Sequence, residues 1–180
     1  MGGFPMSEEQ RTDQEVQELR ERLVRGYEEL AEKARETLDE LGDQAEDAIE
    51  QAVERAQEWL DKAGKYTREE LDELSEFLKR DLAATEDDLR RLVERAKTEL
   101  HPSRLNAGFL SLAAKVTEKA SGALEQLASR LDEARTYRTG QVTGPGTLVC
   151  VNCGEELRMK DTGHIPPCPK CRGTEFRKRW

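Results

Sequence analysis

Apolar residues recur through much of the sequence with steps of three, four and four positions, and this pattern limits the fold more than any other feature. The first run begins at Val16 and reaches Ala63 without leaving phase. Three steps cover eleven residues, about 3.67 per turn, which is close to the 3.6 of a straight α-helix. The pattern therefore predicts long amphipathic helices, each with one narrow apolar face.

Capping signals divide the pattern into three predicted helices, at about residues 7–63, 67–100 and 104–137. The second helix is opened by Thr67, with Glu70 three residues later as its capping-box partner. A narrow stripe cannot be buried by one helix alone, so we expect the helices to pack antiparallel as a bundle or coiled coil.

The first predicted helix contains one candidate break. Gly42 can end a helix and Asp43 can begin the next, which would fold the segment into a hairpin. The stripe passes Gly42 in phase, and a break would usually reset it. We therefore expect one continuous helix over 7–63.

Composition and charge agree with a helical body that carries a different C-terminal part. Ala, Glu, Lys, Leu and Arg supply 94 of the 180 residues, which is typical of long helices and argues against a compact α/β enzyme. Residues 1–140 carry 22 basic and 34 acidic side chains, whereas residues 141–180 carry seven and four. The acidic part repels nucleic acid and anionic lipid, so such a contact would fall to the C-terminal part.

No segment reads as a membrane span or an export signal. The longest uncharged apolar stretch of the helical part, residues 105–114, is shorter than the ~20 residues that cross a bilayer. Residues 1–6 lack the apolar core of a signal peptide and are expected to be disordered. We expect a cytoplasmic protein with reduced cysteines and no membrane contact.

All four cysteines fall in one short C-terminal segment. Cys150 and Cys153 form one CxxC pair, Cys168 and Cys171 form another, and fourteen residues separate the pairs. Two thiolates on each of two tight turns complete a tetrahedron around one metal ion, at about 2.3 Å from each sulfur. With short strands expected at residues 147–150, 156–160 and 174–179, residues 147–180 are predicted to form a β zinc ribbon.

A site with four sulfur ligands has no open position for water or substrate, so it is structural rather than catalytic. We expect one zinc ion per chain, and we expect the ribbon to need it for folding because it has few apolar residues. A single iron ion and structural disulfides are the alternatives, and release of zinc on thiolate oxidation is a further hypothesis.

Other candidate residues lie near this site. His164 is interpreted as an ordinary loop residue, because four sulfurs already satisfy the metal, and His101 is interpreted as a favourable charge at a helix C-terminus. The basic C-terminal end offers charge and rings for a nucleic acid contact. That contact would use Arg172, Arg177, Lys178, Arg179 and Trp180.

Three stretches together resemble a family of uncharacterised bacterial zinc ribbon-containing proteins, classed as a domain of unknown function. They are GTLVCVNCGEEL, IPPCPKCRGTEFRKR and TREELDELSEFLKRDL. The resemblance implies a long helical region before a C-terminal ribbon and implies that the four cysteines bind zinc. It supplies no activity. Arg172 departs from the family, which usually has glycine after the last cysteine, and a left-handed backbone there would cost about 1 kcal/mol.

The sequence therefore predicts a disordered segment at 1–6, an acidic helical domain at 7–138, a Gly/Pro linker at 139–146 and a ribbon at 147–180. It contains no GxSxG, HExxH or GK[ST] motif, so we expect no enzyme. We expect a zinc ribbon-containing interaction or scaffold protein with an unknown protein partner, able to form oligomers through its helices. The alternative is a nucleic-acid-binding ribbon with an acidic helical arm for a protein partner.

Overall fold

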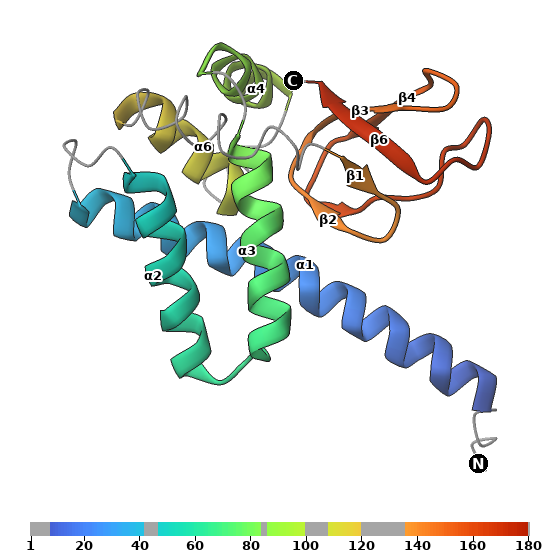
Figure 1. The fold of residues 1–180 in the computed structure, drawn as a ribbon, viewed down its shortest axis with the longest axis horizontal. Helices are drawn as coiled ribbons and strands as arrows, with labels where there is room; N and C mark the ends of the chain where they lie inside the picture. Colours follow the sequence, from blue (N-terminus) through green and yellow to red (C-terminus); the bar gives the residue numbers. More distant parts are fainter. Residues whose placement is uncertain (1–7, 42–46, 84–85, 100–107, 120–135, 180) are drawn as a thin grey trace.

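The computed structural model describes residues 8–41, 47–83, 86–99, 108–119 and 136–179. Helices form one side of the molecule, and a small antiparallel sheet region lies beside them at the C-terminal end (Figure 1). The fold is mainly α with a C-terminal β region, as the sequence predicted. The expected disordered N-terminus and Trp180 lie outside the described residues.

The helices are α1 (Glu8–Leu41), α2 (Ala48–Ala63), α3 (Arg68–Leu82), α4 (Glu86–Glu99) and α6 (Gly108–Lys119). The strands are β1 (Tyr137–Arg138), β2 (Val142–Thr143), β3 (Gly146–Cys150), β4 (Glu156–Met159), β5 (Gly163–His164) and β6 (Glu175–Arg179).

The prediction of one continuous helix over 7–63 is wrong. α1 ends at Leu41, α2 begins at Ala48, and α2 packs against α1. The fold-back lets the two halves of one stripe join a single core, in which these side chains are at most 2% exposed: Leu30, Ala34, Leu38, Ile49, Ala52, Ala56. The constant phase hid the turn, because a connection of suitable length leaves the spacing unchanged. Gly42 and Asp43 themselves lie outside the described residues.

The second predicted helix, 67–100, is also divided. Its start is confirmed: Glu70 N donates to Thr67 Oγ1 at 3.2 Å, and Thr67 N donates to Glu70 Oε2 at 2.8 Å. The helix then ends at Leu82, and Ala83 leaves helical geometry with ψ 44°. The next helix, α4, packs against α6. The break thus gives the second half of the stripe its own partner.

The third predicted helix and the linker need correction where they meet. The structure describes only α6 within 104–137, and Tyr137, predicted to be helical, lies in strand β1. The segment 139–146 contains β2 and the first residue of β3 rather than a free linker. Gly144 lies so close to the Phe109 ring that an added Cβ would sit 2.7 Å from it.

The strands form two small antiparallel sheets. One has the order β1-β6-β3-β4 and the other pairs β2 with β5. In the larger sheet Cys150 is opposite Phe176, and Leu148 is opposite Lys178 on β6. β3, β4 and β6 agree with the three predicted strands to within one residue. Their inward side chains, among them Leu148 and Phe176, form a second core separate from that of the helices.

Carboxylates of α1 fix the start of α6. Phe109 N donates to Glu28 Oε2 at 3.0 Å, and Gly108 N donates to Glu32 Oε2 at 3.3 Å. The first amides of a helix have no partner within it, so these two carboxylates act as caps supplied by another helix. Thr162 of the ribbon also donates to Glu28. α1 therefore orients both α6 and part of the ribbon.

The N-terminal part of α1 has a different environment from the rest of that helix. It extends past the other elements (Figure 1), and every side chain from residue 12 to residue 21 is exposed. No helix in the described ranges is long and apolar enough to cross a membrane.

Candidate metal centre

The two CxxC segments form matching turns. In the first turn Gly154 N donates to Cys150 O at 2.9 Å, and in the second Arg172 N donates to Cys168 O at 2.9 Å. Each turn is closed by a second bond, from Cys150 N to the Glu155 carbonyl and from Cys168 N to the Gly173 carbonyl, both 2.9 Å. β3 delivers the first turn, and the segment before β6 delivers the second. Local backbone bonds alone therefore present two thiols from each turn.

The four cysteine sulfurs gather at one point, as the spacing predicted. All four Sγ atoms lie within 4.8 Å of one another, and the pairs Cys150–Cys171 and Cys153–Cys168 are each 3.6 Å apart. A tetrahedral ion with bonds of about 2.3 Å would place its sulfurs about 3.8 Å apart, so the cluster has the right size for one such ion. The cysteines are free thiols rather than disulfides.

Backbone amides point at the sulfurs and favour the thiolate, the form that binds a metal. Gly173 N donates to Cys171 Sγ at 3.4 Å. The Cys171 amide is the largest influence that lowers the pKa of the Cys168 thiol, to about 7. At Cys153 the Glu155 amide also lowers the pKa, but hydrogen bonds with the other three cysteines and burial outweigh it and raise that pKa to about 12. Cys168 is also buried, which protects a metal–sulfur bond from solvent. The chemistry of the site thus suits a thiophilic divalent ion.

Arg172 adopts the strained backbone that the second turn demands. Its φ is 61°, and it is the one residue other than glycine with a positive φ in the described ranges. Gly154 occupies the equivalent place in the first turn with φ 72°. The departure at Arg172 therefore changes the cost of the turn but not its geometry.

His164 lies away from the sulfur cluster and bridges two parts of the chain. Its Nδ1 is 2.6 Å from the Gly140 carbonyl oxygen and its Nε2 is 3.0 Å from the Arg20 carbonyl oxygen. Both ring nitrogens are thus engaged with backbone oxygens. The interpretation of His164 as a loop residue is wrong, because it lies in strand β5 opposite Val142, and the sulfur cluster forms without it. His101 lies outside the described residues.

The basic end of the chain does not present its charges together. Lys178 points inward, with a side chain only 1% exposed, and Arg179 forms an ion pair with Glu156 at 2.6 Å. Arg172 and Arg177 remain exposed. Trp180 lies outside the described residues.

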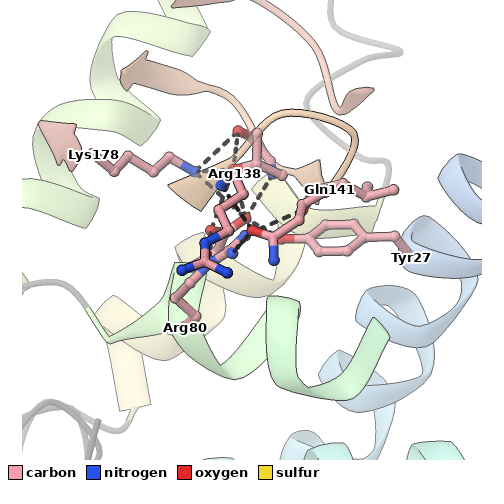
Figure 2. Close-up of polar contacts among 9 residues, drawn as sticks. Tyr27, Arg80, Arg138, Gln141 and Lys178 are labelled. Atoms are coloured by element: carbon pink, nitrogen blue, oxygen red, sulfur yellow. Dashed lines mark hydrogen bonds and ion pairs between the residues drawn. The ribbon is translucent and has the colours of Figure 1, made fainter. Parts of the chain in front are cut away.

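Lys178 belongs to a buried polar cluster that the sequence reasoning missed (Figure 2). At its centre is Asp81, at the end of α3 and fully buried. Its carboxylate accepts bonds from Tyr27 Oη at 2.7 Å, Gly144 N at 2.7 Å and Thr143 Oγ1 at 3.0 Å, and its Oδ2 lies 3.5 Å from Lys178 Nζ. α1, α3, β2 and β6 therefore meet at one carboxylate.

Arg80 extends the cluster toward β1. Its guanidinium donates to Gln141 Oε1 at 2.7 Å and to the Val142 carbonyl at 3.2 Å, and it lies over the Tyr137 ring, 3.9 Å from the centroid. Arg80 Nε is also 3.6 Å from Asp81 Oδ1. The guanidinium thus fastens the end of α3 to the first two strands.

The cluster shifts the acidities of its members in opposing directions. Burial by itself raises the pKa of Asp81, but Lys178, Arg80 and the donated hydrogen bonds outweigh it and hold that pKa below its usual value. Burial lowers the pKa of Lys178 to about 8 against the pull of Asp81. Burial, followed by the charge of Asp81, raises the pKa of Tyr27 well above the usual range.

Helical periodicity cannot reveal this cluster. Arg80 and Asp81 stand beside the apolar stripe in FLKRDL, where charged residues usually face water. Gln141, Thr143 and Gly144 follow about sixty positions later in the chain, whereas Tyr27 precedes Asp81 by 54 positions, so only the tertiary fold brings the cluster together. One signal in the sequence could have pointed to the cluster: Arg80 and Asp81 lie within TREELDELSEFLKRDL, one of the three stretches that carry the family resemblance.

These features define a class of protein, a four-cysteine ribbon built against a helical body. The model of a family described as a zinc-ribbon containing domain matches residues 36–180, so the chain belongs to this family. Tyr27 of the buried cluster precedes the matched residues. A search of curated proteins and a search of solved structures gave no match.

Proposed function

We propose that the four cysteines hold one structural zinc ion and that the protein is a non-catalytic interaction or scaffold module. The observation that carries the proposal is the closed set of four sulfurs, 3.6 Å apart in two pairs. Zinc with four protein ligands keeps no position for water or substrate, whereas catalytic zinc sites use three protein ligands. The ion would complete the ribbon core and supply folding free energy there.

A scaffold role is also supported by the way the ribbon joins the helices. A freely tethered ribbon would share few buried polar contacts with the rest of the chain, but here Asp81 is bonded to residues of both parts. By ordering the ribbon, one zinc ion would thus help to hold together a surface to which both helices and strands contribute. A cavity of about 130 Å³ lies between α4 and the strands β3 and β4, and neither the sulfurs nor Asp81 line it.

The first experiment is elemental analysis of the purified chain beside a Cys168→Ser, Cys171→Ser variant, with Val151→Ser as control because Val151 is exposed in the first turn. We expect one zinc per chain, retained in the control and lost in the cysteine variant. Iron, or less than half a zinc per chain after purification in zinc, would refute the metal assignment. A catalysed reaction that a surface carboxylate substitution removes while zinc stays bound would refute the non-catalytic role.

The nucleic-acid alternative depends on the basic end, and the inward position of Lys178 removes one of its charges from the surface. Arg172 and Arg177 remain exposed for such a contact. Binding of DNA or RNA that weakens steeply with added salt, and that disappears in an Arg172→Ala, Arg177→Ala variant, would support the alternative. No binding at low salt would remove it.

A further inference from the structure

One apolar stripe of α1 is covered at only one end by the described chain. Val16 and Leu19 are 45% and 46% exposed, whereas Tyr27 and Leu30 on the same stripe are fully buried. The spacing that places Tyr27 in the core continues unchanged to Val16. The exposed end therefore has the pattern of a packing face and needs a partner to become one.

Charge is unevenly distributed along this part of α1, residues 12–25, which we call the arm. Residues 12–19 contain three carboxylates and no cation, whereas residues 20–25 contain three arginines and one glutamate. Arg22 is engaged by Glu70 and Arg25 lies 4.0 Å from Glu21, but the side chains of Arg20 and Arg25 are exposed. The arm is thus acidic toward its tip and basic toward its base, so two arms lying antiparallel would place opposite charges side by side.

Helical geometry identifies the residues that would meet. The period of 3.6 puts Asp13, Gln17, Arg20 and Val24 on one flank of the stripe. When a twofold axis relates two antiparallel helices, the same flank of each faces the other. Val16 of one copy then lies against Leu19 of the second, with Asp13 near Arg20.

An open groove of about 390 Å³ adjoins this flank at the base of the arm, between α1 and His164 of the ribbon. Its lining residues are Gln17, Arg20, Glu21, Val24, Arg25 and His164. Val24 gives the groove an apolar floor, and Arg20 and Arg25 give it the charge that an acidic tip requires.

We propose that the arm docks onto the arm of a second copy of this chain, forming an isologous antiparallel dimer. The apolar contact is small and each chain carries a net charge of −9, which opposes association at long range. The dimer is therefore weak, with a dissociation constant on the order of 10–100 µM. The inference goes beyond the structural zinc site and does not depend on it.

Sedimentation velocity of the full zinc-loaded chain, from about 5 to about 500 µM, tests the proposal. We expect a shift from monomer to dimer in the wild type. In a Val16→Ser, Leu19→Ser variant, the dissociation constant should rise about tenfold or more, because two apolar contacts are lost at each of two equivalent places. Val151→Ser removes an equally exposed valine on the ribbon and should change nothing.

A charge exchange tests the antiparallel arrangement itself. Asp13→Arg alone and Arg20→Glu alone should each raise the dissociation constant about tenfold, because each places like charges together. The double variant restores opposite charges and should return to within about threefold of the wild type. Neither substitution creates a like-charge pair at i±3 or i±4 within the helix, and circular dichroism checks that helix content is unchanged.

A wild type that stays monomeric over the whole range overturns the proposal, as does a dimer that the Val16 and Leu19 substitutions leave intact. Failure of the double charge variant to recover overturns the antiparallel register. Zinc content measured on the same samples separates these outcomes from a failure of the metal site.

Discussion

Replacing Asp81 with asparagine should destabilise the protein more than any other change of a single polar atom within the buried cluster. The substitution keeps the shape of the side chain and removes its negative charge. Asp81 is fully buried, and the cations beside it, Arg80 and Lys178, have side chains only 5% and 1% exposed. Asparagine would leave both charges without a counter-ion in a site that water does not reach.

The expected loss follows from the geometry. Removing one partner of a buried ion pair costs about 3–5 kcal/mol, because the remaining charge stays desolvated. Gly144 N and Tyr27 Oη both donate to Oδ2 at 2.7 Å, so the asparagine carbonyl oxygen would take that place and its NH₂ group would replace Oδ1, which lies 3.6 Å from Arg80 Nε. We therefore expect the free energy of unfolding to fall by about 3–5 kcal/mol in urea titrations of the zinc-loaded chain, followed by far-ultraviolet circular dichroism.

A matched control is Asp61→Asn, which breaks an exposed ion pair with Arg68 and should cost less than about 1 kcal/mol. Adding Lys178→Met to Asp81→Asn should recover part of the loss, because the second substitution removes one of the orphaned charges. A loss below about 1 kcal/mol for Asp81→Asn, or a loss no larger than that of the control, would refute the reasoning.

Three further predictions concern the ribbon and its attachment. Arg172→Gly should stabilise the zinc-loaded ribbon by about 1 kcal/mol in thermal unfolding, while Gly154→Ala, at the equivalent positive φ with open space around it, should destabilise it by about as much. The pKa of Lys178 in the folded chain is about 8, below its unfolded value, so the unfolded chain binds more protons above pH 8. The free energy of unfolding of the wild type, relative to that of Lys178→Met, should therefore rise from pH 8 to pH 9.5. A difference that stays flat over this range would contradict the burial of a charged lysine. Removing zinc with a chelator should speed amide exchange at the end of α3, where the ribbon supplies partners to Asp81, more than in α2; equal acceleration in both helices would contradict a local link.

The helical periodicity was sufficient for helix type and faces but not for the connections. It placed Leu30, Leu38 and Ile49 on one apolar stripe, and all three are buried. It did not show that the chain turns back between Leu41 and Ala48, because a turn that preserves phase leaves the sequence pattern intact. Tertiary packing decides such a case: the fold-back lets α2 cover part of the α1 stripe, beside α3 and α6.

The candidate site likewise has one part that the sequence predicted and one part that it did not. The cysteine spacing was sufficient to bring four sulfurs together, because each CxxC turn is closed by backbone bonds within six residues. The buried cluster has no such local origin. Asp81 contacts Thr143 on β2 and Lys178 on β6, and these two residues come together only when the ribbon is folded.

This contrast gives the ribbon a role in the helical body. A buried carboxylate is stable only while its donors are in place, and the donors of Asp81 include Thr143, Gly144 and Lys178, all from the C-terminal part of the chain. Lys178 is on β6, two residues after Phe176, which is opposite Cys150 at the sulfur cluster. We therefore expect the order of the sulfur cluster to affect the position of Lys178, and through Asp81 and its bond with Tyr27 the packing of α3 against α1.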